Sequence, residues 1–226
     1  MKTQKVLNRR QFLTRTSGAI AGAVFAPQFI PAKVLGRVWQ VAPSEQITVG
    51  CIGLGGMGTG NLRGFLEKDT ARVLAVCDVD RAHNERAKRL IDEKYGNSDC
   101  TMYVDFRELL ARSDIDAVMM AVPDQWHGVM GVAAARAGKD IYGEKPLAYT
   151  ISEGRAVVDA INRYGRVWQT GSWQRSQQHF RFACELVRNG RIGEVKTVRV
   201  GLPYGNSIQD RGTQPAAVPD GFDYDT

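Results

Sequence analysis

The chain has 226 residues, which is enough for one domain and part of a second. Its hydrophobic content of 43% and its charged content of 24% are ordinary for a globular protein. The formal charge of +6 suggests a nucleic-acid ligand, but residues 1–36 hold six of the 30 basic residues and no acidic ones. The other 24 basic residues balance the 24 acidic residues, so we expect no nucleic-acid partner.

The N-terminal segment has the layout of an export signal. Residues 8–13, Asn-Arg-Arg-Gln-Phe-Leu, resemble the bacterial twin-arginine motif, and a small-residue apolar run follows at 18–26. A run of about nine residues is too short to cross a hydrocarbon core of roughly 30 Å as a helix. We predict that residues 1–36 are a leader and that the twin-arginine machinery exports the protein to the periplasm or the exterior. An amphipathic helix is the alternative, and an uncleaved leader would tether the protein to the membrane.

The four cysteines show no spacing typical of a metal site, so we predict no bound metal. Cys51 and Cys77 fall in neighbouring predicted strands, where a thiol behaves as a small buried hydrophobe. Disulfides form in exported proteins. Twin-arginine cargo, however, folds before export in a reducing compartment, so we expect that no disulfide is required.

A glycine-rich turn follows the first predicted strand, 47–52. Gly53, Gly55 and Gly58 have the G-x-G-x-x-G spacing of a dinucleotide-binding turn. The first glycine permits the tight turn, the second lets a pyrophosphate approach the backbone, and the third lets the next helix pack on the strand. The phosphates would then lie at the N-terminus of that helix. We assign the whole turn to cofactor binding: Gly53, Gly55, Gly56, Met57 and Gly58.

The second predicted strand, 72–78, ends in Asp78, which is 20 residues after Gly58. A carboxylate at this place accepts hydrogen bonds from the hydroxyls of the adenosine ribose. It favours NAD, because the 2′-phosphate of NADP would meet a like charge. Arg81 nearby would accommodate NADP as the alternative. A glycine turn in some other α/β protein is the alternative to a dinucleotide site.

From residue 46 to residue 170, strands and helices alternate, which predicts an α/β fold with a doubly wound parallel sheet, a Rossmann-type NAD(P)-binding domain. The expected strands are 47–52, 72–78, 102–104, 116–122, 140–143 and 166–170. The expected helices are 57–66, 81–95, 106–111, 124–138 and 150–164. Thr150 and Glu153 have the spacing of a capping box, and Asp124 is expected to cap its helix.

The pattern changes after residue 170. A helix at 180–189 and a strand at 195–201 are expected, followed by a tail rich in Gly, Pro and Asp. This segment is too short to bury a second core of its own. We therefore interpret 171–226 as the incomplete beginning of an α+β C-terminal domain, which would serve substrate binding and oligomerisation.

Several motifs together resemble the Gfo/Idh/MocA oxidoreductases over roughly residues 46–200. They are the glycine turn, Val-Cys-Asp at 76–78, Ala-Val-Pro-Asp-Gln-Trp-His at 121–127, Gly-Glu-Lys-Pro at 143–146 and Gln-Thr-Gly-Ser-Trp-Gln-Arg-Ser at 169–176. The resemblance implies hydride transfer between a bound nicotinamide and a hydroxyl of a sugar or polyol. It also implies homo-oligomers built through the second domain.

Lys145 follows a central strand and lies at the carboxyl ends of the strands, where ligands bind in open parallel sheets. An ammonium there can polarise the reacting hydroxyl or carbonyl, and the resemblance gives the matching lysine a catalytic role. A surface lysine before a proline turn is the alternative. Glu144 is expected to orient Lys145 or to contact the nicotinamide ribose. Pro123 and His127 belong to the loop over the cofactor, where a histidine more often positions than catalyses.

Arg175 and Trp173 follow the sixth predicted strand and are candidates for contact with the substrate. Arg175 would bind a hydroxyl or carboxylate or join the domains, whereas Trp173 would stack on a sugar ring, pack in the core or contact another subunit. The family's second-domain acid and histidine have no match here, because no histidine follows His179. We therefore assign no general acid or base to this chain and expect it to be inactive alone. The alternative functions are an NAD-dependent glycosidase, which oxidises its sugar transiently, and a non-catalytic nucleotide-binding fragment.

Overall fold

The computed structural model describes residues 41–202 and 217–226. The chain divides into two units, residues 1–45 and residues 46–226. The first contains a short 3-10 helix, η1 (Pro43–Glu45), and the predicted leader lies outside its described residues. The proposed boundary between 170 and 171 stays a prediction.

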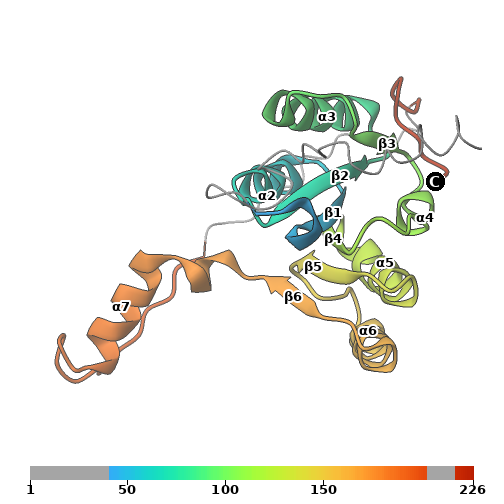
Figure 1. The fold of residues 1–226 in the computed structure, drawn as a ribbon. Helices are drawn as coiled ribbons and strands as arrows, with labels where there is room; N and C mark the ends of the chain where they lie inside the picture. The colour runs from blue at the N-terminus through green and yellow to red at the C-terminus, as the bar shows by residue number, and fades with distance from the viewer. Residues whose placement is uncertain (1–40, 203–216) are drawn as a thin grey trace, which may run out of the picture. The chain divides into compact units, whose positions relative to one another are not determined.

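The second unit contains a six-stranded parallel sheet with the order β3-β2-β1-β4-β5-β6 (Figure 1). Every pair of neighbouring strands is parallel, and β1 lies between β2 and β4, where the chain reverses its direction of winding. This is the strand order of a doubly wound dinucleotide-binding domain, so the predicted fold class is confirmed. The strands are β1 (Ile47–Ile52), β2 (Ala71–Cys77), β3 (Thr101–Tyr103), β4 (Ala117–Met120), β5 (Asp140–Glu144) and β6 (Trp168–Gly171).

Helices connect the strands and are capped by their own sequence. Asp80 accepts the amides of Ala82 and His83 at the start of α3, and Thr150 and Glu153 form the predicted capping box of α6. Asp124 was wrongly expected to be a cap, because it is the first helical residue and Pro123 precedes it without a side-chain cap. The helices are α2 (Gly56–Leu66), α3 (Arg81–Tyr95), α4 (Phe106–Leu110), α5 (Asp124–Arg136), α6 (Ile151–Tyr164) and α7 (Gln178–Arg188), with the 3-10 helix η2 (Trp173–Ser176).

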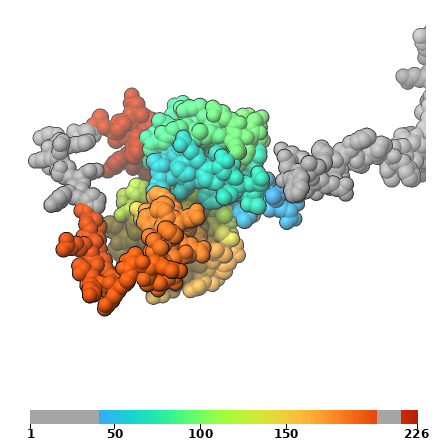
Figure 2. Space-filling model, turned by 90° about the vertical axis from the view of Figure 1, so that its left-hand side faces the viewer, coloured from blue at the N-terminus to red at the C-terminus, as the bar shows by residue number. Residues whose placement is uncertain are grey.

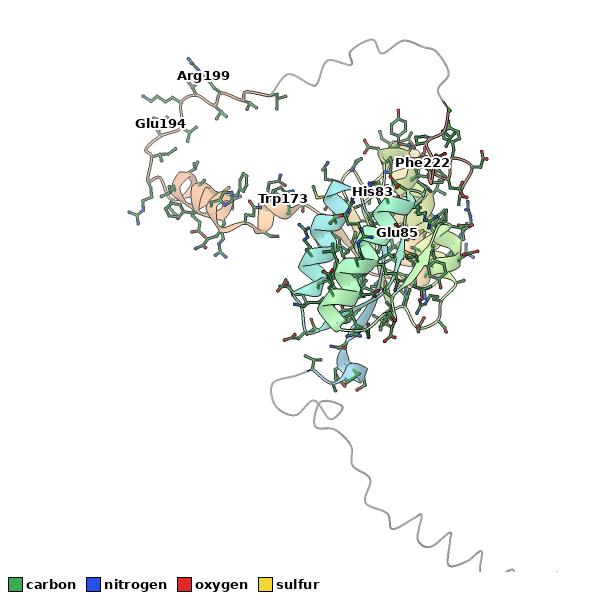
Figure 3. The ribbon with its side chains drawn as sticks, turned by 90° about the horizontal axis from the view of Figure 1, so that it is seen from above. His83, Glu85, Trp173, Glu194, Arg199 and Phe222 are labelled. Carbon is green, nitrogen blue, oxygen red and sulfur yellow. The ribbon has the colours of Figure 1, made fainter. Side chains whose placement is uncertain are left out.

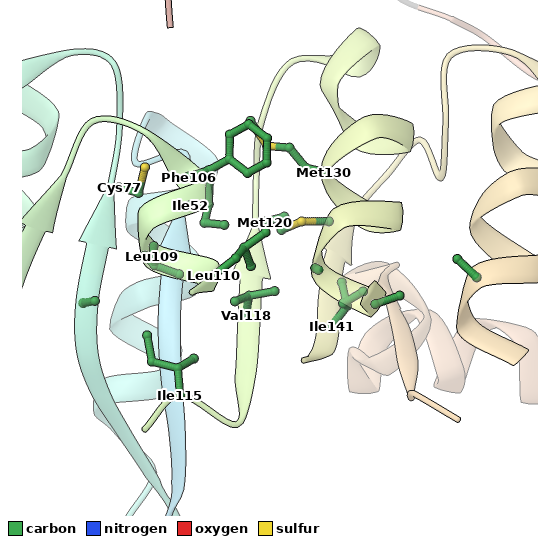
Figure 4. Packing of buried hydrophobic residues seen from close by; sticks show 14 residues of the cluster. Ile52, Cys77, Phe106, Leu109, Leu110, Ile115, Val118, Met120, Met130 and Ile141 are labelled. Carbon is green, nitrogen blue, oxygen red and sulfur yellow. The ribbon is translucent and has the colours of Figure 1, made fainter. Parts of the chain in front are cut away.

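The buried side chains form two clusters. One contains residues of α4, α5 and α6, which pack against side chains of the sheet such as Ile52, Val118 and Met120 (Figure 4). The other joins α2 and α3 to Val49, Cys51 and the neighbouring strands. Adjacent strand residues such as Met119 and Met120 belong to different clusters, because successive side chains of a strand point to opposite faces. The central strands are therefore buried on both faces.

One expected strand is absent from the described residues. Residues 195–201 form no strand, and they are exposed without a neighbouring strand to complete their backbone hydrogen bonds.

Within residues 41–202 and 217–226, no helix is both long enough and apolar enough to span a membrane.

Thiol reactivity provides a test of the packing. Cys51, Cys77 and Cys100 are buried and Cys184 is exposed, and all four are free. Burial raises the pKa of Cys77 to about 12 and that of Cys100 to about 11, so little reactive thiolate exists at neutral pH. We expect Ellman's reagent to modify one thiol in the native chain and four after unfolding in guanidinium. Modification of two or more native thiols would contradict the packing, and a Cys184→Ser variant should lose the single fast site.

Candidate functional site

The glycine turn between β1 and α2 has no room for side chains at two of its positions. Gly53 has a φ of +79°, and a Cβ there would lie 2.6 Å from the carbonyl oxygen of Ala121. A Cβ at Gly58 would overlap with the carbonyl oxygen of Gly53. These two glycines allow α2 to start directly against β1 and β4, as the spacing predicted.

Gly55 and Gly56 differ, because a Cβ at either would meet no atom within 4 Å. Gly55 is the N-cap of α2, and as a glycine it has no side chain to cap the amides of this helix end. Unpaired amides and the helix dipole favour an anion at this place. The turn therefore offers backbone amides beside open space, which fits the pyrophosphate of a dinucleotide.

Asp78 faces this turn from the end of β2. Its Oδ2 accepts the amide of Leu54 at 2.6 Å, and its Oδ1 accepts the amide of Asp80 at 2.9 Å. Only 10% of the side chain is exposed. The carboxylate thus lies beside the glycine turn, where a ribose would be held next to the pyrophosphate.

Side chains of α3 surround Asp78, and no motif in the sequence indicates them. His83 Nδ1 lies 3.3 Å from Asp78 Oδ2, and 32% of the His83 side chain is exposed. Asn84 donates to the carbonyl oxygens of Asp78 and Tyr103, both at 2.8 Å. The N-cap Asp80 was the available signal, since it places residue 83 in the first turn of the helix, facing the strand end.

Arg86, farther along α3, donates a hydrogen bond to the glycine turn and stabilises it. Its Nη2 donates to the carbonyl oxygen of Leu54 at 2.8 Å, and the hydroxyl of Thr59 donates to the same oxygen at 2.8 Å. The turn is thus held by Arg86 and Thr59 on its carbonyl side and by Asp78 on its amide side. No spacing pattern in the sequence predicts the role of Arg86.

Glu144 and Lys145 follow each other at the carboxyl end of β5 but differ in environment. Glu144 is 3% exposed, and its Oε1 accepts the side-chain amide of Asn61 on α2 at 3.0 Å. Its Oε2 lies 3.3 Å from the amide of Lys145, and its carboxylate occupies the space that a side chain at Gly171 would need. Lys145 is exposed and joined to Pro146 by a cis peptide bond. The Glu144 carboxylate is thus buried within the packed fold, whereas the Lys145 ammonium is exposed and can reach a ligand.

Pro123 ends the loop after β4, and His127 lies in the first turn of α5. Pro123 is exposed, whereas His127 is fully buried, with Nε2 2.9 Å from the carbonyl oxygen of Val122. Its Nδ1 has no partner among the described residues. The expectation that His127 lies over the cofactor therefore needs correction: the imidazole has no surface to offer a ligand, and its hydrogen bond to Val122 joins the start of α5 to the loop after β4.

The substrate candidates lie on η2, immediately after β6. Trp173 is 48% exposed, and Arg175 is exposed and forms no ion pair with a described residue. Trp168, by contrast, packs against Gly131 and Gly143 and donates its indole N–H to Thr170. It is a packing residue, whereas Trp173 and Arg175 have exposed side chains.

Lys139 is a buried amine with a structural role, and it lies at the amino ends of the strands. Lys139 precedes β5, is 5% exposed and donates to the carbonyl oxygens of Arg112 and Ile115. Burial lowers its pKa. Because ligands bind at the carboxyl ends of parallel strands, this perturbed group does not mark the site.

Comparison with known proteins gives a family match over the sheet. The model described as "Oxidoreductase family, NAD-binding Rossmann fold" (GFO_IDH_MocA) matches residues 47–172. A glycosyl hydrolase family 109 protein 2 of a Shewanella species is 36% identical over 176 residues, 75% of this chain and 37% of that protein. The alpha-N-acetylgalactosaminidase of Shewanella oneidensis is 29% identical over 210 residues, 84% of this chain and 44% of that protein.

A solved structure is similar in the same region. The scyllo-inositol dehydrogenase of Lactobacillus casei, solved with bound NAD(H) and scyllo-inositol, has a TM-score of 0.58 and 27% sequence identity. The match covers 66% of this chain and 43% of that one. The chain thus spans less than half the length of each of these three proteins.

Proposed function

We propose a function from one premise: the chain belongs to the Gfo/Idh/MocA oxidoreductases, the family with an NAD-binding Rossmann fold. The proposed reaction of the whole protein is reversible hydride transfer between bound NAD and a secondary hydroxyl of a sugar or polyol. The inositol dehydrogenase with bound NAD(H) and scyllo-inositol supports both the cofactor and the substrate class. The part described here would hold the cofactor and supply Lys145.

One observation carries the proposal: the glycine turn is open only where a dinucleotide needs it. Gly53 and Gly58 are closed by neighbouring backbone, whereas Gly55 and Gly56 face free space. Asp78 lies beside the same turn. These features support a pyrophosphate at the start of α2 and an adenosine ribose at the end of β2.

The residues divide the proposed chemistry between them. A bound NAD would supply the acceptor for the hydride of the carbon that carries the hydroxyl, and a general base, which is not assigned to this chain, would take the hydroxyl proton to leave a ketone. Lys145 would polarise the reacting oxygen, because its ammonium is free to turn toward a ligand beside β5. Glu144 would fix the backbone of Lys145 rather than touch the substrate, since it is buried against Asn61. Trp173 and Arg175 would contact the sugar or polyol.

Cofactor binding tests the proposal. We expect the chain to bind NAD and the Asp78→Asn variant to bind it about 10- to 100-fold more weakly, because hydrogen bonds to a charged group contribute roughly 1.5–3 kcal/mol. Asparagine keeps the shape and an oxygen for the amide of Leu54, but its NH2 group faces the amide of Asp80, so the melting temperature should fall moderately while the variant stays folded. Calorimetric titration measures the affinity, and Asp159→Asn on the exposed side of α6 is the matched control. Equal affinities of the Asp78→Asn and Asp159→Asn variants would refute the ribose role.

A glycosidase is the second candidate, because relatives named glycosyl hydrolase family 109 protein and alpha-N-acetylgalactosaminidase match most of this chain. Transient oxidation of a sugar by NAD would acidify a neighbouring C–H and allow the glycosidic bond to be eliminated; water would then add to the unsaturated ketone, and return of the hydride would restore the hydroxyl and the NAD. The product balance separates the two candidates. Release of free sugar without accumulation of NADH favours the glycosidase, whereas one NADH per ketone formed favours the dehydrogenase.

Export through the twin-arginine route stays part of the proposal, since residues 1–40 lie outside the described structure. Homo-oligomer formation through a second domain likewise stays a prediction from the family resemblance.

A further inference from the structure

The C-terminal segment 217–226 lies against the turn that follows β2 (Figures 1 and 2). The amide of Arg81 donates to the carbonyl oxygen of Gly221 at 3.0 Å, and the amide of Asp223 donates to the carbonyl oxygen of Val79 at 2.9 Å. Between these bonds, Asp80 and Phe222 form an antiparallel bridge. Residues 221–223, here called the strap, therefore pair with the turn 79–81 like a minimal edge strand.

The strap has a defined conformation. Gly221 has a φ of +80°, a left-handed conformation that side chains rarely adopt. The Asp223 carboxylate accepts the amides of Asp225 and Thr226, both at 3.0 Å, and the hydroxyl of Thr226 at 2.8 Å. These bonds, with that of the Thr226 hydroxyl the strongest, hold the pKa of Asp223 below its ordinary value. The residues after the strap thus close a turn of their own.

Backbone hydrogen bonds, more than apolar packing, attach the strap. A cleft remains between the segment, the end of β3 and the start of α3, lined by residues that include Met102, Val104, Val218 and Phe222. Phe222 is 39% exposed, and Tyr224 is 77% exposed. A substitution that removes one amide should therefore release the strap without opening a packed core.

The turn that the strap holds is the one that orients Asp78. The amide of Asp80 donates to Asp78 Oδ1, and the other oxygen accepts the amide of Leu54 in the glycine turn. Figure 3 shows Phe222 of the strap and His83, which lies 3.3 Å from Asp78, in the same region. A shift of residues 79–81 would move the amide of Asp80 and so release one oxygen of the Asp78 carboxylate.

We propose that the strap is part of the cofactor site: by pairing with residues 79–81, it positions the Asp78 carboxylate for the hydroxyls of the adenosine ribose. The inference rests on the proposed function, because it assigns Asp78 to that ribose. Residues 221–223 touch no cofactor themselves and act as positioning residues. The alternative is a contact that only stabilises the domain.

The ribose hydroxyl separates these two roles. The unaltered chain should bind NAD about tenfold more tightly than NAD with a 2′-deoxyadenosine, because the deoxy analogue loses a hydrogen bond to Asp78. Asp223→Pro removes the amide that bonds Val79, and Gly221→Val opposes the left-handed conformation. Both variants should bind NAD several-fold more weakly and the analogue, which keeps only the 3′-hydroxyl, with a smaller loss, so that the preference falls below about threefold.

Two further variants serve as controls for the strap variants. Ala217→Pro lies before the strap, where the amide makes no hydrogen bond with a described residue, and it should keep the tenfold preference. Asp78→Asn defines the preference without the carboxylate. The inference is overturned if both strap variants keep the tenfold preference, if they lose affinity for both ligands equally, or if circular dichroism shows both unfolded. An unaltered chain that binds no NAD would overturn the proposed function and this inference with it, whereas NAD binding with an unchanged preference removes the inference alone.

Discussion

Replacing Gly58 by alanine should destabilise the domain by about 3 kcal/mol, among the largest effects expected from adding a single methyl group. The new Cβ would overlap with the carbonyl oxygen of Gly53, which is backbone and cannot turn aside as a side chain can. The helix would have to separate from the strand, and the site would be lost with it. Chemical denaturation measures the change in the free energy of unfolding.

Gly55→Ala provides the contrast within the same turn. Its Cβ would meet no protein atom within 4 Å, so stability should change by less than about 0.5 kcal/mol. The methyl would instead occupy the space of the pyrophosphate, and NAD affinity should fall at least about tenfold. Gly64→Ala, exposed on α2, is the control: it should keep NAD affinity and raise stability by up to about 1 kcal/mol. A stable Gly58→Ala variant, or tight NAD binding by Gly55→Ala, would refute this division of roles.

Lys145→Met should lower the turnover number by about 10²- to 10⁴-fold, the range contributed by a residue that assists proton movement at the reacting group. The substitution keeps the length of the side chain and removes the ammonium. NAD affinity should change less than activity, because the glycine turn and Asp78 do not depend on the Lys145 side chain. Turnover is measured in the whole protein as the rate of NADH formation with polyol substrates.

The control for Lys145→Met is Lys68→Met. Lys68 is exposed and lies just before β2, at the amino ends of the strands and away from the proposed site. The turnover number of this control variant should match that of the unaltered protein. A Lys145→Met variant with normal turnover would exclude the catalytic role and leave the lysine as a surface residue beside the proline turn.

The sequence was sufficient wherever the cause is local. The spacing of Gly53, Gly55 and Gly58 depends on turn geometry, and the structure has the predicted strand, turn and helix there. The capping box at Thr150 is equally local and is confirmed. The strand order follows from alternating strands and helices, since right-handed crossovers leave few arrangements of a parallel sheet.

Residues that act across the fold could not be predicted. Arg86 reaches Leu54 over 32 positions of sequence, and Asn61 reaches Glu144 over 83. No periodicity records such pairs, because they depend on how α2 and α3 pack against the sheet. The expected strand at 195–201 failed for a related reason: its β-branched residues were present, but a strand also needs a neighbour to pair with.

The Asn61–Glu144 hydrogen bond has a consequence for recombination between relatives. It links the helix at the glycine turn to the strand that precedes Lys145, and the same carboxylate fills the place of a side chain at Gly171. A chimera that exchanges residues 47–122 with a homologue would separate these partners and leave a desolvated carboxylate without its donor. A chimera of this domain should therefore take residues 61, 144 and 171 from the same parent protein.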